Sequence, residues 1–232
     1  KQSAKKYTGS SYIAYFQAYT NTYASLAYLE KLYMEAILHP DIRILSIATR
    51  PDCLSTEILD LLERLNQIKP VWVELGLQTI HERTARYIRR GYDLPVFETA
   101  VSELRRRGID VIVHTILCLP GETKPDMLQT IQYLNRQDIQ GIKLQLLHIL
   151  KDTDLAEIYA SDPFPVPDPQ EYYELLGACI SHLRPDIVIH RLTGDGPKEL
   201  LTAPLWTCNK RQVLNQLQSY FKTHDIWQGK EY

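Results

Sequence analysis

Three polar side chains occur in one strand-turn-helix stretch of the sequence, and their spacing indicates a ligand site. Glu74 lies inside the apolar run VWVEL, Gln78 follows that run, and Arg90 precedes Gly91. A carboxylate in a buried strand is costly unless it meets a partner, so the strand is expected to end at a polar site. Ligands of parallel α/β folds bind at such strand ends. The alternatives are a core ion pair for Glu74 and a surface cation for Arg90, and for either residue taken alone they are favoured.

Two loops carry further candidates. Arg50 and Asp52 flank a proline after the apolar run at 42–48, where they could form a simple loop ion pair or face a ligand. Gly194 and Gly196 follow a later apolar run and could cradle a phosphate or form a tight turn. A short glycine pair is weakly specific, so the turn is favoured.

Two more polar residues lie within apolar runs. His114 stands in the run at 111–117, where a lone histidine is more often a satisfied core residue than a ligand. Lys143 and Gln145 alternate with apolar residues at 142–147. That pattern is typical of a half-exposed strand, or of a barrel strand with one face toward the lumen.

Local spacing gives no metal site. The four cysteines form no CxxC or CxxxCxxC group, so each is expected to be a buried or free thiol rather than a ligand: Cys53, Cys118, Cys179 and Cys208.

The elements that would position these residues alternate regularly. Strands are predicted near 12–16, 42–48, 71–75, 111–117, 142–147 and 187–192. Helices are predicted to follow them, the first capped by Thr20 or Asn21 and the second by Ser55, with later helices at 94–107, 127–134, 171–183 and 209–220. The pattern favours parallel βα units in an α/β fold, curled towards an open barrel by right-handed crossovers.

The chain is expected to form one domain. Its core is placed at 1–160, and 161–232 continues the same domain after the proline-rich stretch DPFPVPDP. The 232 residues are 44% hydrophobic and 23% charged, with a net charge of -2, so no overall basic field favours nucleic acid, although binding stays possible. No membrane-spanning run or signal peptide is present, which indicates the cytoplasm and no membrane partner.

Several stretches together resemble the radical S-adenosylmethionine (SAM) superfamily, in the branch of elongator-type proteins and oxygen-independent coproporphyrinogen oxidases. They are IATRPDCL at 47–54, VELGLQTIHERTARYIRRGYD at 73–93, HTILCLPGET at 114–123 and GIKLQLLHILKDTDL at 141–155. With YFQAYTNTYA at 15–24 and HRLTGDGPKELLTAPLWTCNK at 190–210, the chain is similar to the uncharacterised YhcC-like group over nearly its whole length.

The resemblance implies a partial TIM-like βα barrel that lacks its first βα unit and whose rim holds SAM and a [4Fe-4S] cluster. It implies that Gln78 and Arg90 face the ribose and carboxylate of SAM, that His114 contacts the ribose, and that the loop from Leu119 to Gly121 packs near the adenine. It also places Gln17 and Asn21 in the turn for the amino group. Lys143 is expected to open onto the same cavity as Gln78, Arg90 and His114.

Substrate contacts are expected from Arg50, Asp52 and His148. They are also expected from four residues that lie beyond the matching cofactor stretches: Arg191, Asp195, Asn209 and Lys210. The substrate itself is unknown.

Two departures from the family pattern matter. Ala48 stands where relatives place an acidic residue, and the CxxxCxxC-type cluster motif is absent. The resemblance places that motif upstream of Lys1, so this chain is expected to be an inactive fragment of an enzyme that generates a 5'-deoxyadenosyl radical. An electron donor such as flavodoxin or ferredoxin is the implied partner. A barrel enzyme with another cofactor and a catalytically silent binding domain stay open as alternatives.

Overall fold

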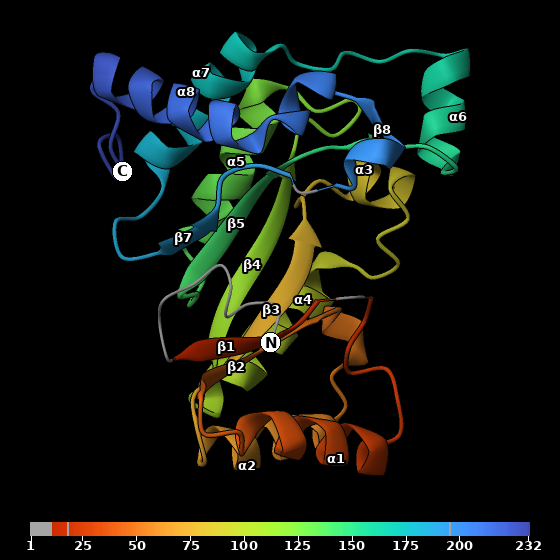
Figure 1. Cartoon of the computed structure of the whole chain (residues 1–232), viewed down its shortest axis with the longest axis vertical. Helices are drawn as coiled ribbons and strands as arrows, with labels where there is room; N and C mark the ends of the chain where they lie inside the picture. Colours follow the sequence, from red (N-terminus) through yellow and green to blue (C-terminus); the bar gives the residue numbers. More distant parts are fainter. Residues whose placement is uncertain (1–10, 18, 195) are drawn as a thin grey trace. The chain divides into compact units, whose positions relative to one another are not determined.

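The computed structural model describes residues 11–17, 19–194 and 196–232, and the chain forms two compact units (Figure 1). Unit 1 comprises the described residues of Lys1–Gly76 and Tyr92–Val113. Unit 2 comprises those of Leu77–Gly91 and His114–Tyr232. The chain passes between the units three times: inside β3 (Val71–Gln78), between Gly91 and Tyr92, and inside β4 (Asp110–Leu117).

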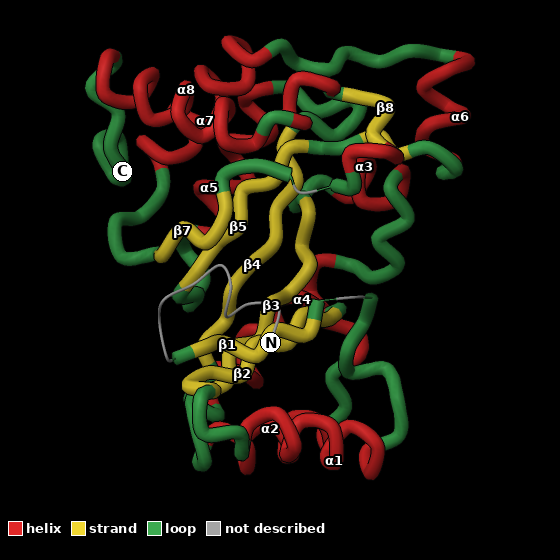
Figure 2. Tube along the Cα trace, viewed as in Figure 1, coloured by secondary structure: helices red, strands yellow, loops and turns green. Residues whose placement is uncertain are grey.

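Six strands form one sheet in the order β1-β2-β3-β4-β5-β7. Parallel pairs join β1 (Tyr12–Phe16) to β2 (Ile42–Thr49), β2 to β3, and β5 (Gly141–Leu146) to β7 (Val188–Arg191). Neighbours in this order follow one another along the chain with helices between them, seen as yellow and red segments in Figure 2. The predicted α/β fold of parallel βα units is confirmed.

In unit 1, helices α1 (Leu26–Ile37) and α2 (Thr56–Asn66) lie side by side (Figure 1). Buried residues of α1 recur on one helical stripe: Leu29, Tyr33 and Ile37. Ser55 caps α2 as predicted, since its side chain accepts the N–H of Ile58. The cap predicted for α1 at Thr20 or Asn21 is wrong, because α1 starts after Ser25.

The third strand is longer than its sequence pattern suggests. The strand predicted near 71–75 stops before Gly76, but β3 continues through this glycine to Gln78, and the short helix α3 (Glu82–Tyr87) begins only after a loop. Glycine in a strand lacks a side chain to pack but keeps its ladder hydrogen bonds, so it need not terminate the strand. The next helix, α4 (Leu94–Arg106), matches the predicted helix at 94–107 and is followed by Gly108 in the left-handed conformation.

In unit 2, several helices begin at polar caps. Helix α5 (Lys124–Leu134) starts at Lys124 rather than Met127 because Thr123 and Asp126 form a capping box. Asp168 does the same with Glu171 for α7 (Pro169–His182), and Asn209 caps α8 (Lys210–Thr223). Figure 1 shows α7 and α8 side by side. No described helix is long and apolar enough to cross a membrane.

Three short elements of unit 2 were not predicted. Helix α6 (Asp154–Ser161) has only 8 residues and buries none of them, so its apolar pattern spans too few turns to reveal a helix in a sequence. Strands β6 (Ile149–Leu150) and β8 (Leu201–Ala203) pair antiparallel with each other outside the main sheet. They are too short to show an alternating pattern.

Candidate functional site

The carboxylate of Glu74 belongs to a hydrogen-bonded cluster in unit 1. Glu74 is only 4% exposed, and it accepts the hydroxyl of Tyr15 at 2.9 Å and that of Ser46 at 2.7 Å. The three residues come from neighbouring strands β1, β2 and β3. Buried polar atoms need such partners, so Glu74 is a satisfied carboxylate of the core, and the prediction that this strand ends at a ligand site stays a prediction.

The loop after β1 is tied to the end of β2. The side-chain amide of Asn21 donates to the carbonyl oxygens of Phe16 at 3.0 Å and Ala48 at 2.8 Å, and the Asn21 N–H also donates to Ala48. Gln17 lies exposed in the same loop. Asn21 thus fixes the loop, and the prediction that this turn binds the cofactor stays a prediction.

Arg50 and Asp52 form the loop ion pair that their spacing suggested. The guanidinium of Arg50 donates twice to the carboxylate, at 2.9 and 2.6 Å, and lies 5.9 Å from the ring centre of Tyr92. Hydrogen bonding to Asp52 raises the pKa of Arg50. Both side chains are partly exposed, so this is an ion pair at the surface of the loop.

In unit 2, a hydrogen-bond network joins two of the stretches on which the resemblance rests. Arg90 has a side chain only 1% exposed, and its guanidinium donates to the Thr79 carbonyl at 2.8 Å and to Glu82 at 2.7 Å. The Thr79 hydroxyl donates to Glu122 at 2.5 Å, and burial raises the pKa of Glu122. Arg90 therefore holds the β3–α3 loop, which in turn holds the loop after β4.

Strained backbone marks the ends of two strands. Gln78, the last residue of β3, has φ 63°, and Cys118, directly after β4, has φ 64°. Residues other than glycine rarely adopt this left-handed conformation, and such outliers gather at functional sites. The Arg90 network flanks both positions in sequence, with Thr79 after Gln78 and Glu122 four residues beyond Cys118.

A row of polar side chains crosses β4, β5 and β7 on one face. His114 Nδ1 lies 3.5 Å from the side-chain nitrogen of Gln145, and Lys143 is in register with Arg191. Lys143 and Gln145 are two residues apart, so they share that face. Lys143 is buried, and the other three are half-buried. The structure thus brings together His114, Lys143 and Arg191, and adds Gln145, which alternation alone had left ambiguous between a solvent face and a lumen.

Gly194 and Gly196, which follow β7, lie against the imidazole ring of His148. A side chain at Gly194 would begin 2.6 Å from the ring of His148, and one at Gly196 would begin 2.9 Å from it. The Gly196 N–H donates to His148 Nδ1 at 3.2 Å. These glycines are therefore explained by close approach to His148, while Asp195 lies outside the described residues.

The remaining substrate candidates have structural contacts. Asn209 caps α8 by accepting the N–H of Gln212 at 3.3 Å, and exposed Lys210 is the first residue of that helix. Their predicted role in substrate binding stays a prediction.

The loop after β4 lies between two hollows of unit 2. Leu119 is 2% exposed, and Gly121, with φ 82°, leaves room for the guanidinium of Arg83. One hollow of about 670 Å³ is lined by α3, Pro120 and the segment after α6. The other, of about 450 Å³, is lined by Leu119, Met127 and the start of α7. Leu119 and Gly121 are thus placed at ligand-sized spaces.

The described thiols do not fit an iron-sulfur cluster. Among the residues that the structure describes, no group of three histidine, cysteine or acidic side chains could hold a metal ion. Burial raises the pKa of both Cys118 and Cys179 to about 12. A metal ligand must be a thiolate, so these two thiols are poorly suited to the role.

Family models and similar proteins identify the family of this chain. A family model for the Radical SAM superfamily matches residues 2–134, and one for the Radical_SAM C-terminal domain matches residues 139–223. The chain is 39% identical over 226 residues to the uncharacterized protein YtqA of Bacillus subtilis, covering 97% of this chain and 70% of YtqA. It is 36% identical over 216 residues to protein YhcC of Escherichia coli, covering 93% and 70%.

The fold has a solved counterpart. The solved structure of Elp3 from the archaeon Methanocaldococcus infernus, with residues 1–46 deleted, matches with a TM-score of 0.81 at 16% identity. The match covers 98% of this chain and 57% of that one. At this identity the likeness shows the fold alone, and it agrees with the predicted fold class.

Proposed function

The chain belongs to the radical SAM superfamily, and on this premise we propose that it provides the SAM-binding part of an enzyme that cleaves SAM reductively. When bound, a [4Fe-4S] cluster would supply the electron for cleavage to a 5'-deoxyadenosyl radical, which then acts on a substrate. The thiols described in this chain do not fit such a cluster, so the chain's own part in the reaction is to bind and orient SAM.

The left-handed backbone at Gln78 and Cys118 carries this proposal. Backbone strain persists only where surrounding structure enforces it, and here buried Arg90 bonds the carbonyl of Thr79, next to Gln78, while the Thr79 hydroxyl bonds Glu122 in the loop after Cys118. We propose that Gln78 and His114 contact the ribose of SAM. Arg90 supports this loop from the protein side, since its guanidinium is bonded to Thr79 and Glu82.

The proposal also includes an electron-donor protein and a location in the cytoplasm. The electron would come from a protein such as flavodoxin or ferredoxin. A reducing cytoplasm suits the chain because its four cysteines are free thiols.

Titration calorimetry of SAM into the purified chain tests SAM binding. We expect Gln78→Ala to weaken binding about tenfold, because one hydrogen bond to a buried ligand group is lost. Gln218→Ala is the matched control, since Gln218 is exposed on α8. Failure of the unaltered chain to bind millimolar SAM, or equal affinities of the Gln78 and Gln218 variants, would refute the proposal.

A further inference from the structure

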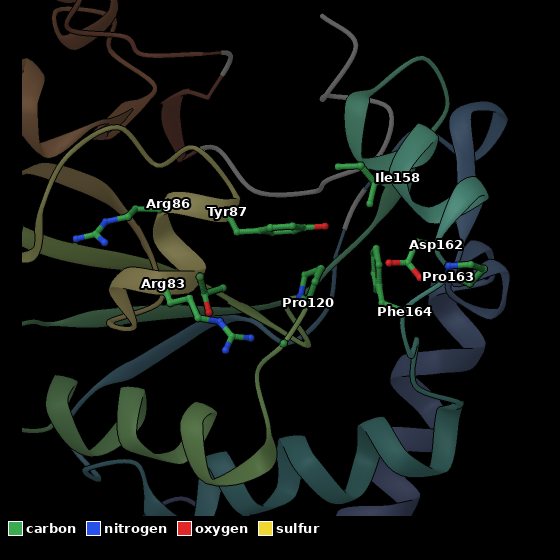
Figure 3. Close-up of a pocket in the computed structure, with 10 residues that line it drawn as sticks. Arg83, Arg86, Tyr87, Pro120, Ile158, Asp162, Pro163 and Phe164 are labelled. Atoms are coloured by element: carbon green, nitrogen blue, oxygen red, sulfur yellow. The ribbon is translucent and has the colours of Figure 1, made fainter.

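The larger hollow of unit 2 is a slot with aromatic walls (Figure 3). Tyr87 of α3 lines one side and is 45% exposed. Pro120, Ile158 and Phe164 line the other sides. Phe164 is held in place by Tyr159, whose ring centre lies 5.1 Å away in a T-shaped arrangement. Exposed aromatic rings around a ligand-sized space suit a planar ligand.

Opposite charges face the slot at two places. Arg83 points toward the Pro120 loop, and Asp162 lies next to Phe164 (Figure 3). Neither side chain forms an ion pair with any residue that the structure describes. A cation and a carboxylate left without ion-pair partners at a pocket can each serve a polar end of a ligand.

The position of Arg83 is built into the fold. A Cβ atom at position 121 would lie 2.9 Å from a guanidinium nitrogen of Arg83, so the glycine leaves room for this side chain. The nearby carboxylate of Asp126 accepts hydrogen bonds from Thr123. These bonds are the main cause of its lowered pKa, and the charge of Arg83 has a smaller effect. Arg83 thus acts on Asp126 through its charge, and the residues that the structure describes give it no ion-pair partner.

From this arrangement we propose that the slot binds a nucleotide unit. The base stacks on Tyr87, the phosphate accepts hydrogen bonds from Arg83, and Asp162 accepts an N–H from the edge of the base. Arginine binds phosphate through paired N–H donors, and aromatic side chains stack on bases of any sequence. The inference does not rest on the proposed function, because SAM carries no phosphate.

The test is titration calorimetry of the whole chain with the four 5'-mononucleotides, the matching nucleosides and inorganic phosphate. Arg83→Gln should weaken mononucleotide binding about tenfold and leave nucleoside binding unchanged, because it removes the charge-assisted phosphate contact. Arg86→Gln is the matched control: it removes the same charge from the same helix, and although Arg86 also lines the hollow, its guanidinium extends away from Phe164 and Asp162 (Figure 3). We expect less than a twofold effect from it.

Aromatic stacking is tested separately. Tyr87→Ala should weaken both mononucleotides and nucleosides about tenfold, whereas Tyr87→Phe keeps the ring and should retain their affinity. Asp162→Asn should change the preference among the four bases. Tyr87 and Asp162 are exposed, so the variants should fold, and circular dichroism with thermal melting checks this.

Several results would overturn the proposal: no mononucleotide binding at millimolar concentration, equal losses in Arg83→Gln and Arg86→Gln, phosphate alone binding as tightly as nucleotides, or displacement of the nucleotide by SAM one for one. A 5'-phosphorylated single-stranded tetranucleotide identifies the source. Binding about tenfold tighter than the mononucleotide assigns the slot to a nucleic-acid strand, and equal binding assigns it to free nucleotides.

Discussion

At the scale of single residues, Gln78 combines an unfavourable backbone with a proposed contact to SAM. An alanine at a left-handed position pays a steric cost that glycine avoids. We therefore expect Gln78→Gly to be about 1 kcal/mol more stable than Gln78→Ala, while both bind SAM more weakly than the unaltered chain. Chemical denaturation and calorimetry measure the two effects. A glycine variant less stable than the alanine variant would contradict the strain seen at φ 63°.

The half-buried carboxyl of Glu122 should make folding depend on pH. Burial raises its pKa in the folded chain, although hydrogen bonding to Thr79 opposes the shift. The folded chain therefore holds this proton more tightly than the unfolded chain does. Its contribution to stability is present at low pH and is lost as the pH rises from the ordinary carboxyl pKa through the raised value.

Replacing Glu122 by glutamine removes that titration and keeps an oxygen that accepts from Thr79. The stability gained in Glu122→Gln over the unaltered chain should therefore grow between pH 4 and pH 7 in denaturant titrations. Glu57 gives the opposite sign, because backbone and Ser55 hydrogen bonds lower its pKa. Glu57→Gln should lose stability, relative to the unaltered chain, as the pH rises over the same range. Parallel pH curves for both variants would rule out this account.

The residue types of the sequence indicated where polar partners are needed. They did not predict the backbone conformation of Gln78 or the long-range hydrogen bond of Glu122. Glu74 in an apolar strand predicted a polar cluster, and Tyr15 and Ser46 form one with it. Nothing in a single sequence shows that Gln78 turns left-handed, since most residues other than glycine avoid that conformation. Likewise, Glu122 reads as a turn residue until Thr79, 43 positions away, is seen to bond it.

At the scale of elements, two helix starts make a controlled comparison. Asp168 and Glu171 bond each other's backbone N–H at 2.9 Å, whereas Ser25 starts α1 without a side-chain bond. Asp168→Ala should therefore lower the free energy of unfolding by about 1 kcal/mol, and Ser25→Ala by a few tenths at most. Urea titration measures both. Equal losses would mean that the capping box of α7 contributes nothing.

The glycine loop after β7 gives a second prediction at this scale. Gly194→Ala would place a methyl group 2.6 Å from the His148 ring, and crowding of this kind costs about 1–3 kcal/mol. Removing the ring in His148→Ala should relieve that cost. The double variant should thus be more stable than the sum of the two single losses predicts, and an additive result in the double-mutant cycle would exclude the contact.

Strong periodicity decided which elements could be predicted. The six strands of the main sheet match apolar runs of the sequence, since strands buried in a parallel sheet are almost continuously apolar. Helix α6 has no buried stripe, and β6 and β8 are held by pairing with each other rather than by a pattern of their own. Tertiary contacts fix these elements, so no local signal marks them.

At the scale of the whole molecule, the cysteines determine what this chain can assemble by itself. We expect anaerobic reconstitution with iron and sulfide to give no stoichiometric [4Fe-4S] cluster, because the described cysteines do not converge with other ligands and desolvation raises the thiol pKa of two of them. Iron counting and the visible spectrum check this. The matched sample is a chain extended upstream, and a full cluster in the short chain would contradict the prediction.

The proline-rich segment between α6 and α7 forms part of the wall of both hollows in unit 2. Asp162, Pro163 and Phe164 line the slot, and the next three residues, Pro165 to Pro167, line the smaller space. Three prolines restrict the backbone angles of this segment, so it resists local bending. A ligand that displaces one end of a stiff wall changes the space at the other end. Occupants of the two hollows would then influence each other's affinity reciprocally, by the same factor in each direction.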